Sequence, residues 1–205
     1  MRRALAAGSI VLLAAGVSPA VANGFSAAFV DAFKSACVPQ RLSYKGTVEQ
    51  AKAEGWATFD VVSHPEFDAV MKLSAKGLEE AKAEGLAVAF QYEAFAKTVS
   101  DRPLHLVVSF GETEYLDEIG CYLYDFGAEA PVIANDVSGA LGIKPAQSME
   151  TAELSGHVWG PPPSMPRTLD TYLTYIPKGS PNVEAAGFDG VVLKFTTSAP
   201  DEEGQ

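Results

Sequence analysis

Apolar residues recur every three or four positions near the start of the chain, which predicts a helix there. This helix is expected to begin at Ser26 and to end before Pro39, because proline cannot continue a helix. Its apolar face consists of Phe29, Val30, Phe33 and Cys37. We therefore expect this helix to pack on the core along that face.

Two capping boxes predict the next two helices. Thr47 is followed three residues later by Gln50, and this pair is expected to start a short helix that ends at Gly55. Ser63 is followed in the same way by Glu66 and is expected to start a longer helix that runs to about residue 84. The buried stripe of the longer helix is expected to be Phe67, Val70, Met71, Ser74, Leu78 and Ala81.

From residue 86 the hydrophobic period changes to two, which is typical of strands. One alternating run contains Val88, Phe90 and Tyr92, and the next contains Leu104, Leu106, Val108 and Phe110. Residues 100–103 read Ser-Asp-Arg-Pro and are expected to form the turn between them. A third strand over residues 119–126 completes a predicted antiparallel meander.

The second half of the chain predicts one helix and three further strands. Pro131 near its start and Gly142 after its end bracket the helix. The strands are expected over residues 153–159, 168–176 and 190–197. This order indicates an α+β fold in which N-terminal helices pack on a largely antiparallel sheet. We expect a single domain over residues 23–198, followed by a flexible acidic tail over residues 199–205.

The N-terminus has the order of a secretory signal peptide. Arg2 and Arg3 precede an apolar stretch over residues 4–17, and the small-residue triplet Ala20-Val21-Ala22 follows. The apolar stretch is shorter than the roughly 20 residues that a membrane-spanning helix needs. We therefore expect cleavage after Ala22, no stable membrane insertion after cleavage, and a periplasmic or secreted protein of a Gram-negative-type envelope.

Charge narrows the classes of partner. The chain has a formal net charge of −11, and removal of the predicted leader, with its two arginines and no acidic residue, makes it −13. Binding to nucleic acid depends on basic side chains that neutralise phosphates, and this chain has no basic cluster. We expect no nucleic acid partner, and the remaining candidates are an unidentified protein or a small ligand.

The exported chain contains one pair of cysteines, Cys37 and Cys121. An oxidising compartment favours a disulfide between them. Two buried free thiols are the alternative, whereas the C-x-x-C pattern of redox proteins does not occur.

Strong catalytic motifs are missing from the sequence. It contains no G-x-S-x-G nucleophile elbow, no H-E-x-x-H zinc motif and no glycine-rich phosphate or dinucleotide loop. We therefore assign no catalytic residue, metal or cofactor from the sequence. Because catalytic triads are defined by geometry, missing motifs leave enzymatic function open.

The alternative function is a hydrolase or a metal-assisted enzyme that uses His157 or His105 with an acidic partner such as Glu112 or Asp117. The third histidine, His64, is expected to cap a helix or to lie on the surface. The acidic residues cluster at Glu112, Glu114, Asp117 and Glu118. This cluster fits a solvated turn, a calcium-type site or an acid–base pair.

The leading hypothesis is an exported, non-catalytic binding protein or envelope-associated protein, and a structural envelope factor without a discrete ligand is a further possibility. The candidate ligand or partner surface consists of His157, Trp159, Tyr122 and Tyr124. Trp159 precedes a stiff proline-rich stretch, and exposed tyrosines are enriched at interfaces. The competing interpretation is that Trp159 packs a rigid surface loop and that the tyrosines belong to the core of the sheet.

Overall fold

The computed structural model of the chain describes residues 19–85, 88–113 and 116–198. Residues 1–18 of the predicted leader, the predicted tail over 199–205, and Glu114 of the acidic cluster lie outside the described residues. No helix of the described part is long and apolar enough to cross a membrane.

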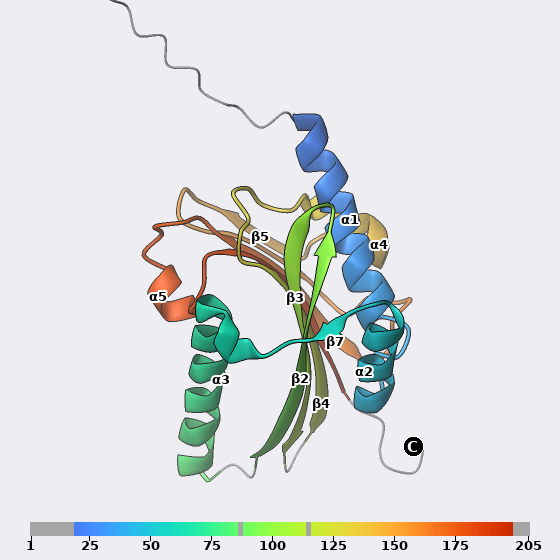
Figure 1. Cartoon of the computed structure of the whole chain (residues 1–205). Coiled ribbons are helices and arrows are strands. Elements are labelled where there is room, and N and C mark those ends of the chain that lie inside the picture. The colour runs from blue at the N-terminus through green and yellow to red at the C-terminus, as the bar shows by residue number, and fades with distance from the viewer. Residues whose placement is uncertain (1–18, 86–87, 114–115, 199–205) are drawn as a thin grey trace, which may run out of the picture.

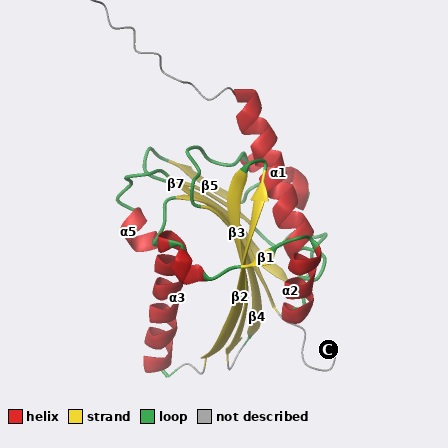
Figure 2. Cartoon of the chain, viewed as in Figure 1, coloured by secondary structure: helices red, strands yellow, loops and turns green. Residues whose placement is uncertain are grey.

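The centre of the molecule is one eight-stranded antiparallel sheet with the strand order β1-β2-β3-β4-β8-β7-β6-β5. The strands are β1 (Ala57–Thr58), β2 (Val88–Val99), β3 (Arg102–Thr113), β4 (Asp117–Asp125), β5 (Gln147–Glu150), β6 (Ser155–Trp159), β7 (Thr168–Ile176) and β8 (Gly190–Ser198). The predicted α+β class and the predicted meander are confirmed. The sheet is covered unequally on its two faces, as Figures 1 and 2 show.

Three helices cover one face of the sheet: α1 (Pro19–Cys37), α2 (Tyr44–Ala53) and α4 (Ala134–Leu141). The other face carries α3 (Pro65–Ala83), the short 3₁₀ turn η1 (Val61–Ser63) and the short helix α5 (Val183–Ala186). Each face has its own apolar cluster, because strand side chains alternate between the two sides. We call these the α1 face and the α3 face.

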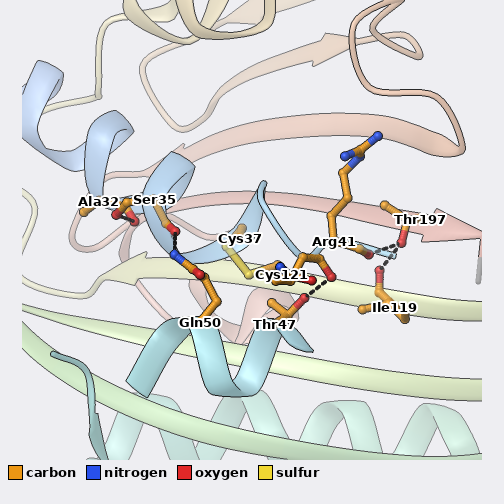
Figure 3. The surroundings of a disulfide bond; sticks show 10 residues. Ala32, Ser35, Cys37, Arg41, Thr47, Gln50, Ile119, Cys121 and Thr197 are labelled. Carbon is orange, nitrogen blue, oxygen red and sulfur yellow. Dashed lines mark hydrogen bonds between the residues drawn. A yellow bond between two sulfur atoms is a disulfide. The ribbon is translucent and has the colours of Figure 1, made fainter. Parts of the chain in front are cut away.

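The α1 face holds the larger core. Phe33 of α1 meets Phe195 of β8 edge to face, with ring centroids 5.3 Å apart. At the end of α1, Cys37 forms a disulfide with Cys121 of β4, and the two Cα atoms lie 5.9 Å apart. The predicted disulfide is confirmed, and it fastens α1 to the middle of the sheet (Figure 3).

Two predicted helix starts on the α1 face were wrong. α1 begins at Pro19 instead of Ser26, so the predicted cleavage point after Ala22 falls inside its first two turns. Ser26 is buried, and its hydroxyl accepts a hydrogen bond from the Ile133 amide and donates one to Asp136. It therefore ties α1 to the start of α4, which begins at Ala134.

The short helix α2 also begins earlier than predicted. Ser43 is its N-cap and accepts from the Gly46 amide at 3.1 Å. Thr47, the predicted cap, is buried inside the helix, and its hydroxyl donates to the Gln40 carbonyl at 2.8 Å (Figure 3). A threonine can satisfy its hydroxyl in this way wherever a carbonyl lies within reach, so the capping-box pattern misplaced the start.

The strand predictions differ from the structure mainly at the sheet edges. β7 has the predicted bounds, β6 begins at Ser155 instead of residue 153, and β8 continues to Ser198. The edge strands β1 and β5 were not predicted. All of their residues are exposed, so neither strand shows an alternating apolar pattern.

Candidate functional site

Helix α3 packs on the sheet only through its first two turns. His64 caps it by accepting from the Phe67 amide through Nδ1, which confirms the capping role expected for His64, whereas the start predicted at Ser63 was wrong. Of the predicted stripe only Phe67 and Val70 are buried, and from Leu73 onward most side chains of the helix are exposed. The remainder of α3 leaves an open space above the sheet.

This space consists of two cavities of about 290 and 240 Å³ that share four lining residues. We call them together the α3 groove. The wall on the helix side includes Met71, Ser74 and Leu78. The floor on the sheet side consists of Phe90, Val107, Ser109, Gly111, Glu118, Gly120, Tyr122, Tyr124 and Thr196.

Small residues on β3 and β4 leave space for the groove above this part of the sheet. Ser109 of β3 pairs directly with Gly120 of β4, and Gly111 lies two positions further along β3. A Cβ atom on Gly120 would lie 2.5 Å from the Ser109 Oγ and 2.5 Å from the Tyr122 ring. Glycine is therefore required at position 120 for Tyr122 to lie across the floor.

Tyr122 lines both cavities, and the carboxylate of Glu118 lines the second one. Burial raises the pKa of its hydroxyl, a hydrogen bond with Ser109 opposes this shift, and the nearby Glu118 adds to it. The hydroxyl is therefore protonated at neutral pH and can donate a hydrogen bond.

A lysine lies beside the groove between two tyrosine rings. Lys194 of β8 places its Nζ 5.8 Å from the ring centroid of Tyr122 and 5.3 Å from that of Tyr172. Burial lowers its pKa, and within the described residues no carboxylate forms an ion pair with it. Lys194 is thus a half-buried cation that lies against two aromatic rings and forms no ion pair within the described residues.

An aromatic cluster anchors the start of α3 above the groove. Phe67 inserts beside His105 of β3, with ring centroids 5.5 Å apart, and His64 lies 4.8 Å from the same imidazole. His105 is 4 % exposed and its Nδ1 has no hydrogen-bond partner within the described residues. Burial, and then the charge of His64, lower the pKa of His105 to about 4. Because His64 and His105 are far apart in the sequence, their contact could not be predicted from it.

The four residues of the predicted binding surface do not share one face. Tyr122 and Tyr124 both line the α3 groove. His157 and Trp159 lie on the opposite face, where Trp159 is completely buried and its indole N–H donates to Ser138 of α4 at 3.1 Å. The groove therefore includes only the tyrosine half of the predicted surface.

The two acidic partners named for an enzyme, Glu112 and Asp117, lie far from His105. Glu112 pairs with Asp117 at one end of the β3–β4 ladder, whereas His105 lies seven residues away along β3, about 23 Å at the usual strand rise. His157 instead shares a hydrogen bond through Nδ1 with Ser148 at 2.9 Å, and its Nε2 lies 3.7 Å from a carboxylate oxygen of Glu150. Ser148 and the exposed Glu150 both belong to β5, so these two contacts join β5 to β6.

The described part of the acidic cluster comes together only in part, since Glu112 and Asp117 are cross-strand partners and Glu118 is not. Glu112 is exposed, and Asp117 and Glu118 follow each other on β4 with side chains on opposite faces. Among the residues that the structure describes, no group of three or more potential metal ligands lies together.

A larger cavity, about 1090 Å³, lies away from the groove, between the start of α1, the β2–β3 turn and the loop over residues 127–132. Its one basic residue, Arg102, is already paired with the buried Asp125 at 2.8 Å and stacks on Phe25 at 4.3 Å. Burial raises the pKa of Asp125, and Arg102 opposes that shift. The charge of Arg102 is therefore neutralised by Asp125 within the fold, whereas Lys194 has no such partner among the described residues.

Comparison of the chain with protein-family models, with curated proteins and with solved structures gives no match. Function must therefore be inferred from the chemistry of the groove itself. Its distinctive features are an apolar helix wall, small residues in the floor, a protonated tyrosine hydroxyl and an adjacent lysine that forms no ion pair in the described part of the chain.

Proposed function

We propose that this chain is an exported binding protein that holds a small amphipathic anion in the α3 groove. The observation that carries the proposal is the combination of an apolar groove with a half-buried lysine that lacks a carboxylate partner within the described residues. Concave, mostly apolar sites with a few convergent polar groups are typical of small-ligand binding.

The apolar body of the ligand would lie between α3 and the sheet. Leu78 and Phe90 line both cavities from opposite sides, so an aromatic or aliphatic body can contact both. Phe90 is 39 % exposed without a ligand, and covering this apolar surface would favour binding. Ligand pockets commonly measure roughly 300–1,000 Å³, so two joined cavities of about 290 and 240 Å³ fit a ligand of modest size.

The acidic group of the ligand would pair with Lys194. A cation that is half removed from water interacts more strongly with an anion than a fully solvated one does. The Tyr122 hydroxyl, which is protonated at neutral pH, offers a hydrogen bond on the same side. The net charge of −11 disfavours larger polyanions, which supports a ligand with a single small anionic group.

Export is part of the proposal because the predicted leader and the disulfide support it together. Disulfides persist in oxidising compartments and are rare in the cytosol. The Cys37–Cys121 bond joins two elements of the main core, so it fits a chain that matures outside the cytoplasm.

A matched pair of fluorescent probes tests the two parts of the site separately. 8-Anilinonaphthalene-1-sulfonate carries an aromatic body and an anionic group, whereas N-phenyl-1-naphthylamine has the same body without the charge. We expect the purified chain to bind both. Lys194→Met should weaken binding of the sulfonate about tenfold, the size of one charged hydrogen bond, and should change binding of the neutral probe less than twofold.

Two tryptophan variants of α3 provide the blocking control. Leu78→Trp should fill the groove and reduce binding of both probes, while Ala83→Trp, on an exposed position that does not line it, should bind both as the unmodified chain does. Thermal unfolding of all three variants checks that the fold is kept. Equal binding by the Leu78→Trp and Ala83→Trp variants would show that the probes bind elsewhere and would contradict the proposal.

A further inference from the structure

The outer edge of β2 is long and largely uncovered. β1 pairs with only two of its twelve residues, Ala96 and Phe95, and the Phe59 amide donates to the Ala94 carbonyl at 2.9 Å. Between Ala94 and the start of β2, no described strand pairs with this edge. An uncovered edge of this kind is a template for pairing with another strand.

The side chains on this edge lack the features that usually protect an edge strand. Over residues 89–94 there is no proline, and the single charge, Glu93, is held by Lys52 at 2.9 Å. Phe90 and Tyr92 are 39 % and 38 % exposed. The opposite edge strand, β5, is protected in the usual ways, because it has only four residues, all exposed, and ends on Glu150.

The backbone of β2 can pair with a second copy of itself. Ala94 directs its carbonyl outward to Phe59, so Phe90 and Tyr92, at alternate positions, direct their N–H and C=O groups outward as well. An antiparallel pairing centred on Gln91 places Phe90 opposite Tyr92 of the partner subunit, and each such pair exchanges both of its hydrogen bonds. The same register stacks the two aromatic side chains across the interface.

The charge distribution around β2 favours a second copy as the partner. The chain as a whole has a net charge of −11, which opposes self-association. The elements flanking this edge are balanced, however: α2 carries one net positive charge, α3 one net negative charge, and β2 none. The α3 charges are further paired, for example Lys72 with Asp68 and Lys82 with Glu79.

We propose that the protein forms a symmetric dimer in which the β2 strands of two copies pair antiparallel about Gln91 and join the two sheets. A twofold interface of this kind uses the same patch on both subunits. Because Phe90 also lines the α3 groove, the two grooves would lie on either side of the joint.

Single cysteine variants test the dimer and its register. At the twofold axis, Gln91 faces Gln91 of the partner subunit as a non-hydrogen-bonded pair, with Cα atoms about 4.5 Å apart, which a disulfide can bridge. We expect Gln91→Cys to form a covalent dimer on mild oxidation. Ala89→Cys is the matched control, because the two copies of residue 89 would lie about 13 Å apart along the strands and cannot be bridged.

Sedimentation of the unmodified chain completes the test. We expect a dimer at concentrations on the order of 100 μM, a monomer for Tyr92→Pro, and a dimer for Thr98→Pro, which places proline on the same edge beyond β1. A monomeric unmodified chain, or equal crosslinking of the Gln91→Cys and Ala89→Cys variants, would overturn the proposal and leave this edge to a strand of another protein. Probe binding by a monomer would show that the groove proposal stands independently.

Discussion

At the scale of single residues, a few side chains define the molecule and only some of them could be recognised in the sequence. His105 follows strand alternation, because it lies on the α3 face while its neighbours Leu104 and Leu106 lie on the α1 face. The role of Gly120 could not be predicted, because a glycine in a strand can serve several structural purposes. Only the structure shows that Gly120 leaves room for the Tyr122 ring. The cap of α3 was placed one residue too early because an imidazole nitrogen accepts the bond that a serine hydroxyl usually takes.

His105 is expected to make the stability of the protein depend on pH. Its pKa is about 4 in the folded protein and roughly 6.5 when unfolded, so the unfolded chain binds more protons between these values. Its contribution to stability is therefore complete above about pH 6.5 and is lost as the pH falls toward about 4. The predicted loss is on the order of 2 to 3 kcal/mol.

Urea unfolding at pH 7.5 and pH 5 measures this contribution. His105→Phe keeps an aromatic ring in the cluster but cannot be protonated, so the difference in unfolding free energy between the two pH values should be smaller in this variant. His157→Phe, on the other face of the sheet, is the comparison for a general effect of losing a histidine. A pH dependence that is the same with and without His105 would contradict the assignment.

At the scale of elements, α3 differs most from its predicted form. Its apolar period predicted burial along the whole helix, but only the part around Phe67 and Val70 is buried, and the α3 groove lies between the remainder and the sheet. Periodicity identifies the face that can be buried, and the neighbouring strands decide how much of it is. The same reasoning explains why β5, whose four residues are all exposed, gave no signal.

Hydrogen exchange within α3 should reflect this partial packing. We expect amides over residues 76–84 to exchange much faster than those over residues 68–71, because the second half has few buried contacts to oppose local opening. Mass spectrometry of peptides from the two halves measures the difference within one helix. Uniform protection along α3 would mean that the groove is closed in solution.

At the scale of the whole molecule, the sequence predicted the class, the antiparallel meander and the disulfide, because each rests on a periodic or pairwise signal. The groove has no such signal. It arises where Ser109, Gly111 and Gly120 come together under α3, and small residues from separate strands show no pattern along the chain. The predicted binding surface of His157, Trp159, Tyr122 and Tyr124 combined residues from opposite faces, since residue type alone does not reveal which side of a sheet a residue occupies.

The most direct test of ligand binding in the α3 groove is an amide NMR titration of the mature chain with 8-anilinonaphthalene-1-sulfonate. If the α3 groove is the binding site, the largest shift changes will lie at Leu78, Gly111 and Gly120, and Lys194→Met will reduce them. Changes concentrated around Phe25 and Arg102, which line the larger cavity, or the lack of any saturable change, would contradict the assignment of function to the groove.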